Sequence, residues 1–245
     1  EMNTNDFKKI KVIPRRMIDI KNRSTATSIL GQKIQFPVII APVGGQRNFH
    51  EEGVMGSTKA AETAGTINVV PTNSGYSLEE VAKNTTQKHW FQIYHYDKEV
   101  TKDLILRAQN SGYNAICLTV DGVRTDRRER DKRNNLQLED SKWGANLINY
   151  PGLIQNISLK GQDSMAEITY NTIEWIREIT NLPLVIKGII SPDDAKKLEE
   201  IGVNGIVVSN HGGRVTDSMQ SSISALPKIK NVVSPEFELY LDSGI

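Results

Sequence analysis

The stretch Gly205-Ile-Val-Val-Ser-Asn-His-Gly-Gly-Arg214 determines the expected fold class. Its short apolar run with β-branched residues predicts a strand that is buried on both faces, as strands of parallel sheets are. The run continues into a polar loop in which Gly212 and Gly213 permit a sharp turn. We therefore expect His211 and Arg214 at the carboxyl end of the strand, where parallel α/β folds keep their chemistry.

His211 and Arg214 are residue types suited to a small organic acid. A histidine can accept a proton near neutral pH, and an arginine can hold a carboxylate through two parallel hydrogen bonds. A lone histidine in a loop is more often a surface or packing residue, which is our interpretation of His50 and His89. That interpretation is weaker for His211, because it lies between Asn210 and two glycines at a strand end.

Apolar runs with strand character alternate with stretches of helical character. The expected strands are Phe36–Ala41, Thr66–Val70, His89–Tyr94, Ala115–Val120, Leu184–Ile189, Gly205–Ser209 and Phe237–Leu241, and the expected helices include Glu52–Ala64, Lys98–Asn110, Tyr170–Thr180 and Pro192–Ile201. This alternation predicts parallel βαβ units, and many units in series predict a TIM (β/α)8 barrel of the α/β class. Seven strands are visible where a closed barrel has eight, so we expect an incomplete barrel.

Length and composition fit one domain over residues 1–245. A net charge of +1 gives no support for a nucleic-acid or membrane partner. No apolar run approaches the ~18 residues of a membrane-spanning helix. The single cysteine, Cys117, lies in an apolar strand, where a buried, unreactive thiol is the expected state. Asn135–Ser164 lacks strong periodicity and predicts a mobile insertion of the kind that serves as a lid.

The opening stretch resembles the signature of the FMN-dependent α-hydroxy acid oxidases and dehydrogenases, in which Ser-Asn-His-Gly-Gly/Ala-Arg is followed by an aspartate, here Asp217. The other motifs that match, in the family's order, are Pro37-Val-Ile-Ile-Ala-Pro42, Ser74-Gly-Tyr-Ser-Leu-Glu-Glu-Val81, Trp90-Phe-Gln-Ile-Tyr94, Leu118-Thr-Val-Asp121, Arg127-Arg-Glu-Arg-Asp131, Pro183-Leu-Val-Ile-Lys-Gly188 and Asp242-Ser-Gly-Ile245. The resemblance runs from about Pro14 to the last residue. Ser74-Gly75 and Leu241-Asp-Ser-Gly244 are most similar to the lactate-oxidising members.

The resemblance implies FMN as cofactor and a small L-2-hydroxy acid as substrate. L-lactate and O2 would react to pyruvate and hydrogen peroxide, in a homotetramer. The expected location is the cytoplasm, because the single cysteine cannot form an intrachain disulfide. No side chain accepts a hydride, so such a reaction requires a redox cofactor. No Gly-x-Gly-x-x-Gly follows a strand, which argues against a Rossmann nicotinamide site.

Carried over by position, the resemblance assigns catalytic roles to His211, Asp121 and Tyr94. His211 would take the hydroxyl proton of the substrate, and Asp121 would stabilise its protonated form. Tyr94 would donate a hydrogen bond to the hydroxyl or carboxylate oxygen. Arg128 and Arg214 would hold the substrate carboxylate, although Arg128 lies in a charge run that is otherwise typical of a solvated face.

The resemblance also implies a cofactor site at the strand ends, and no metal. Its residues would be Ala41, Pro42, Val43, Gln92, Thr119, Lys187, Ser209, Asp242 and Gly244. Lys187 would stabilise negative charge near flavin N1, and Gln92 and Thr119 would hydrogen-bond the pyrimidine edge of the flavin. The backbone of residues 41–43 would lie against the ring system.

Some positions depart from the family pattern. Asp126 replaces a glycine, Pro71 replaces a polar residue that contacts the flavin, and Val215-Thr216 replaces Gln-Leu. Relatives also have an earlier helical segment, and after Asp-Ser-Gly they have an eighth strand and a phosphate loop. We therefore expect part of a longer protein or a shortened relative. The alternatives are a flavin dehydrogenase that uses another electron acceptor and an inactive relative that acts as a binding or structural piece.

Overall fold

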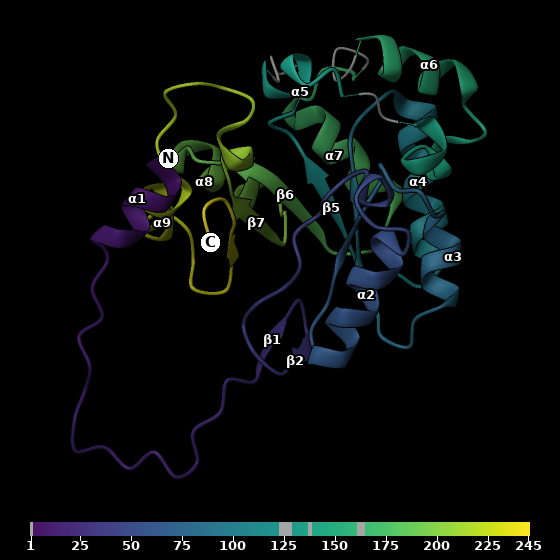
Figure 1. Cartoon of the computed structure of the whole chain (residues 1–245). Helices are drawn as coiled ribbons and strands as arrows, with labels where there is room; N and C mark the ends of the chain where they lie inside the picture. Colours follow the sequence, from purple (N-terminus) through teal and green to yellow (C-terminus); the bar gives the residue numbers. More distant parts are fainter. Residues whose placement is uncertain (1, 123–128, 137–138, 161–164) are drawn as a thin grey trace.

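The computed structural model describes residues 2–122, 129–136, 139–160 and 165–245. A six-stranded parallel sheet with the order β3-β4-β5-β6-β7-β8 forms its centre (Figure 1). The strands are β3 (Val69–Pro71), β4 (Trp90–Ile93), β5 (Ala115–Thr119), β6 (Leu184–Ile189), β7 (Gly205–Val208) and β8 (Glu238–Leu241). Each strand lies beside the next one along the chain, as expected when each crossover carries a helix.

Helices connect these strands and pack against the outer face of the sheet. They are α2 (Gly53–Ala64), α3 (Leu78–Lys83), α4 (Lys98–Asn110), α7 (Tyr170–Ile179), α8 (Pro192–Glu200) and α9 (Ser222–Lys230). The start of α8 follows the predicted pattern, because the Ser191 hydroxyl accepts a hydrogen bond from the Asp194 N–H at 3.3 Å and Pro192 is the first helical residue. In the described ranges, no helix has the length and apolar character to cross a bilayer.

The expected strand Phe36–Ala41 is wrong in extent, since it is reduced to one bridge between Ile40 and Asn68. Pro37 has no backbone N–H to donate to a ladder, and Val38 instead donates to the Phe36 carbonyl at 2.8 Å. At the other edge, β8 pairs only with β7 among the described residues. The barrel is therefore open between Ile40 and β8, as the sequence predicted.

A hairpin covers the amino-terminal end of the barrel interior. It consists of β1 (Thr27–Ile29) and β2 (Gln32–Ile34), whose Ile29 and Ile34 are buried against the interior cluster. The other buried members of that cluster are Ile67, Val69, Trp90, Ala115, Cys117, Val185 and Val207. The Trp90 and Tyr240 rings meet edge-on with centroids 5.1 Å apart. Cys117 is buried, as expected, and burial raises the pKa of its thiol to about 12.

We expected a mobile insertion at Asn135–Ser164, and the described part of this segment includes short helical elements. It contains the short helices η2 (Asp140–Lys142) and η3 (Ala145–Leu147) and the helix α6 (Pro151–Lys160). Buried Trp143 and Leu147 anchor it to the hydrophobic cluster between the sheet and its helices, which we call the outer core. The buried Asn146 side chain donates to the Thr72 carbonyl at 2.9 Å and accepts from the Leu78 N–H at 2.7 Å. These contacts were not predictable from periodicity, because they join segments far apart in the chain.

The helix α1 (Met2–Lys9) packs against α9, which lies near the other end of the sequence. Residues 10–26 connect α1 to the hairpin as a fully exposed segment without helix or strand. Figure 1 shows this segment as a long loop that leaves the body of the protein. The sequence pattern predicted neither α1 nor the hairpin.

Two buried histidines predict a loss of stability in mild acid. Burial lowers the pKa of His89 and of His95 below the ordinary value of 6.5. The unfolded chain therefore binds protons that the folded chain excludes. The free energy of unfolding should be highest above that ordinary value and fall as pH decreases through it, by at most about 1.4 kcal/mol per pH unit for each histidine.

Urea unfolding at about pH 7 and about pH 5.5 measures this effect. The variant His95→Gln retains a side chain that can bond the Thr101 hydroxyl, which lies 2.9 Å from His95 Nδ1. It should show a smaller difference between the two pH values. An unchanged difference would contradict the assignment to His95.

Candidate active site at the carboxyl end of the sheet

His211 and Asp121 meet at the carboxyl ends of β7 and β5. His211 Nδ1 lies 2.8 Å from Asp121 Oδ1, and the two side chains are 22% and 9% exposed. Because a carboxylate accepts hydrogen bonds, Nδ1 carries the hydrogen, and Nε2 of the neutral ring is free to accept a proton. Asp121 Oδ2 is buried and has no hydrogen-bond partner among the described residues. The pair has the arrangement of a general base with its orienting carboxylate.

The loop holds His211 in an uncommon backbone conformation. His211 has φ +55°, which lies in the left-handed region that non-glycine residues seldom occupy. Its N–H donates to the Ser209 hydroxyl at 3.1 Å, and the Gly212 N–H donates to the Ser243 hydroxyl at 2.9 Å. Side-chain oxygens from two strand ends therefore satisfy the amides of this turn.

A contact from the start of the chain supports the same loop. The side-chain amides of Asn3 and Asn210 exchange two hydrogen bonds, of 2.9 and 2.8 Å. The Asp6 carboxylate in the same helix accepts a hydrogen bond from the Ser221 hydroxyl. Helix α1 thus fixes the residue that directly precedes His211. Nothing in the sequence pattern of Asn3 predicted this role.

Polar side chains occupy the interior where β4, β5 and β6 end. Gln92, Thr119 and Lys187 are 3%, 2% and 5% exposed, and Gln92 donates to the Thr119 hydroxyl at 3.1 Å. Lys187 Nζ donates to the Ser209 hydroxyl at 3.0 Å and lies 3.0 Å from Asp242 Oδ2. A buried ammonium group and a buried carboxamide above an apolar interior indicate a site for a polar ligand.

Known proteins are similar to this chain over almost its whole length. Residues 1–245 match the family model of the FMN-dependent dehydrogenases. An L-lactate oxidase of Nostoc sp. is 41% identical over 254 aligned residues, which cover 98% of this chain and 69% of that protein. The chain belongs to the FMN-dependent dehydrogenase family.

Other members of the family are similar over the same extent. Glycolate oxidase of Spinacia oleracea is 35% identical over 99% of this chain and 68% of its own length. A crystal structure of mandelate oxidase superposes with a TM-score of 0.91 at 36% identity, covering 100% of this chain and 69% of that one. The partial barrel is therefore a portion of the α/β barrel of this family.

The polar interior cluster has the chemistry that FMN requires. Gln92 retains a second amide hydrogen after its bond to Thr119, and the Thr119 hydroxyl retains its own hydrogen. A flavin pyrimidine edge presents carbonyl oxygens and one N–H, so these groups match it in kind. The Lys187 ammonium adds a positive charge in a buried setting, where it acts strongly on a nearby anion.

The structure shows the burial and backbone of most of the remaining expected site residues. Tyr94 follows β4, is half-buried and meets the Tyr96 ring edge-on with centroids 6.4 Å apart. Arg214 is exposed three residues after His211. Ala41 and Pro42 are half-buried after the Ile40 bridge, Val43 is 52% exposed, and Gly244 has φ +91°. Arg128 and Asp126 lie outside the described residues.

Thr72 is a buried site residue that sequence reasoning missed. Its hydroxyl donates to the Gln92 carbonyl at 2.6 Å, and its N–H donates to Gln92 Oε1 at 3.4 Å. It therefore orients the carboxamide so that Nε2 points toward Thr119. The sequence contained one signal for Thr72. Pro71 occupies the position where the family has a polar residue, and the next residue, Thr72, is polar.

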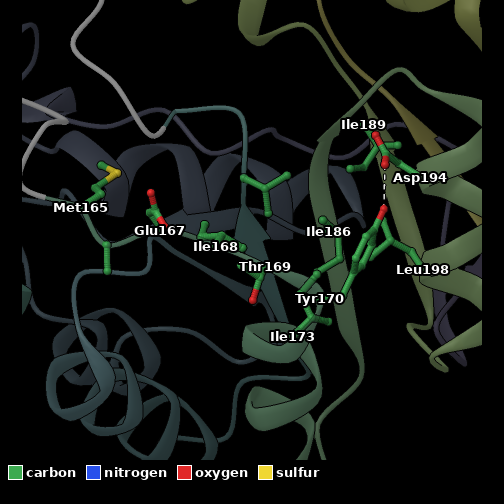
Figure 2. Close-up of a pocket in the computed structure, with 12 residues that line it drawn as sticks. Met165, Glu167, Ile168, Thr169, Tyr170, Ile173, Ile186, Ile189, Asp194 and Leu198 are labelled. Atoms are coloured by element: carbon green, nitrogen blue, oxygen red, sulfur yellow. Dashed lines mark hydrogen bonds between the residues drawn. The ribbon is translucent and has the colours of Figure 1, made fainter.

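A cavity of about 870 Å³ lies on the opposite face of β5 and β6. Its described lining includes Val120, Ile186, Ile189 and Leu198, whereas Lys187 contacts Ser209 and Asp242. At the cavity wall the Tyr170 hydroxyl donates to Asp194 at 2.7 Å, drawn as the dashed line in Figure 2. This hydrogen bond raises the pKa of Tyr170 to about 12. The described lining of the cavity contains none of the candidate site residues.

Proposed function

We propose that this protein oxidises a small L-2-hydroxy acid, with L-lactate as substrate, FMN as cofactor and O2 as the final electron acceptor. The observation that carries the proposal is the His211–Asp121 pair, 2.8 Å apart at the end of the sheet that also holds buried Lys187. The similarity to the L-lactate oxidase of Nostoc supports the choice of substrate.

In the proposed reaction, His211 Nε2 accepts the proton of the substrate hydroxyl. The α C–H bond breaks with its electron pair, and the hydroxyl carbon becomes the carbonyl carbon of pyruvate. FMN supplies the two-electron acceptor that no side chain provides. The Asp121 carboxylate stabilises the positive charge that His211 gains and holds the ring in one orientation. O2 then takes up two electrons and two protons to give hydrogen peroxide.

The remaining roles position substrate and cofactor. We assign the substrate carboxylate to Arg214 and Arg128, and its hydroxyl or carboxylate oxygen to Tyr94. Gln92, Thr119 and Lys187 would hold the pyrimidine edge of FMN. The residues left for contacts with the ring system and its surroundings are Ala41, Pro42, Val43, Ser209, Asp242 and Gly244.

A homotetramer in the cytoplasm forms the last part of the proposal. The support for the tetramer is the resemblance of the motifs to the family's oxidases, and the support for the compartment is the single, buried cysteine. Size-exclusion chromatography with light scattering tests the tetramer, and a monomeric mass for the flavin-loaded protein would remove it.

An absorption spectrum tests the proposed function. The purified protein should carry the spectrum of oxidised FMN, lose it on anaerobic addition of L-lactate and regain it on admission of O2 with formation of hydrogen peroxide. Reduction by lactate followed by slow reaction with O2 would favour a dehydrogenase with another acceptor. Colourless protein that takes up no added FMN would favour an inactive binding or structural piece.

The carboxylate clamp leads to a prediction for Arg214. Arg214→Lys keeps the charge but loses the planar pair of N–H donors, so substrate and carboxylate inhibitors should bind about tenfold more weakly or worse. Titration of the flavin spectrum with a carboxylate inhibitor measures this. Arg177→Lys, on the outer helix α7, is the matched control and should leave binding unchanged. Equal inhibitor affinity in Arg214→Lys and the parent protein would contradict the clamp.

A further inference from the structure

We propose that Gly188 is a positioning residue for Asp121, because a side chain at position 188 would displace the Asp121 carboxylate from His211. The inference rests on the proposed function for the base role of His211. Gly188 is not among the site residues named above. Gly188 lies in β6, between Lys187 and Ile189.

Gly188 interrupts the pairing of β6 with β7. Lys187 pairs with Val207 and Ile189 pairs with Val208, so Gly188 has no partner in this ladder and forms a bulge. The bulge changes the alternation of the strand. Lys187 points into the interior, and Ile189 packs in the outer core where regular alternation would turn it inward.

The bulge brings the Gly188 backbone directly against Asp121. A Cβ atom on Gly188 would lie 2.4 Å from Asp121 Cγ, 2.6 Å from Asp121 Cβ and 2.8 Å from Asp121 Oδ1. Each distance is shorter than a nonbonded carbon contact allows. Gly188 also has φ +108°, a conformation that favours glycine. The atoms that would clash include Oδ1, which bonds His211 Nδ1.

Few hydrogen bonds from the described residues hold the Asp121 carboxylate in place. Its hydrogen bond to His211 is the one that the described residues provide, and its buried Oδ2 has no partner among them. If the carboxylate moved away from His211, no second hydrogen bond from the described residues would hold it in its present position. The absence of a side chain at Gly188 allows the 2.8 Å contact to form.

The test compares Gly188→Ala with Gly112→Ala. Gly112 has φ +85°, and a Cβ atom on it would meet no described atom within 4 Å, so its substitution introduces backbone strain without a clash. Proton NMR of the imidazole N–H of His211 reports the hydrogen bond to Asp121 directly. Gly188→Ala should lose this strongly deshielded signal, and Gly112→Ala should retain it.

Rapid-mixing kinetics supply the second measurement, on the flavin-loaded protein. The limiting rate of flavin reduction in Gly188→Ala should fall about 10²-fold, as expected for a misplaced catalytic group, while the affinity for a carboxylate inhibitor stays unchanged. A general structural defect would instead weaken inhibitor binding as well. Retention of both the NMR signal and the rate in Gly188→Ala would overturn the inference.

A second comparison, made in the Asp121→Gly variant, tests the inference if Gly188→Ala alone does not fold. Asp121→Gly removes the atoms that the new methyl would meet, so the double variant Gly188→Ala/Asp121→Gly should fold and reduce flavin at the rate of Asp121→Gly alone. A further loss in the double variant would show that Gly188 acts through something other than Asp121, and would overturn the inference. If the NMR result holds but no 2-hydroxy acid reduces the parent protein, the proposed function fails and the positioning role stands.

Discussion

Replacing His211 by glutamine is expected to lower the rate constant of flavin reduction by about 10²–10⁴-fold, the usual contribution of a general base. Glutamine fills a similar volume and can still accept a hydrogen bond, but it cannot take up the hydroxyl proton. The cofactor should remain bound, because the contacts that Gln92 makes with Thr119 and Lys187 makes with Asp242 do not involve the imidazole. Anaerobic rapid mixing with L-lactate measures the rate.

His50→Gln is the matched control for this prediction. His50 is exposed, and its Nδ1 accepts only the Glu52 N–H, at 3.2 Å, among its described contacts. The control variant should reduce flavin at the parent rate. If His211→Gln reduces its flavin at the parent rate as well, His211 is not the base.

Lys187→Met is expected to destabilise the protein by about 3–5 kcal/mol, because it leaves the Asp242 carboxylate without its cation. The Lys187 side chain is 6% exposed and the Asp242 side chain is 19% exposed, so water replaces the lost ammonium poorly. FMN affinity should fall too, since the buried positive charge beside the proposed flavin site is lost. Urea unfolding of the FMN-free protein measures stability apart from cofactor binding.

A second substitution separates the two effects of Lys187. In Lys187→Met/Asp242→Asn the unpaired charge is removed, so most of the stability should return. FMN affinity should stay low, because no cation is restored. If the double variant is as unstable as Lys187→Met, the Lys187–Asp242 pair is not the cause of the loss.

The strands and helices that could be predicted are those whose burial follows a local period. Both β6 and α4 have the bounds expected from the apolar pattern of their own residues. The strand at Phe36–Ala41 failed because pairing depends on neighbours, and Pro37 together with an open barrel edge leaves a single bridge. The hairpin of β1 and β2 was missed because only Ile29 and Ile34 mark it as buried.

The site could be predicted where a motif carries it. The contact between His211 and Asp121, which the family resemblance implied, is confirmed by the geometry. The Asn3–Asn210 contact and the approach of Gly188 to Asp121 were not predictable, since both depend on where distant backbone segments pass. Arg128 stays a prediction, because it lies outside the described residues.

The exposed segment of residues 10–26 makes α1 an intramolecular ligand of the loop that carries His211. The fraction of molecules in which α1 is docked then depends on its effective concentration at the loop, which is of the order of mM for short flexible linkers. A protease that cuts the tether would convert this docking into a bimolecular equilibrium. The order of the turn at His211 would then depend on protein concentration, so dilution alone would loosen this turn.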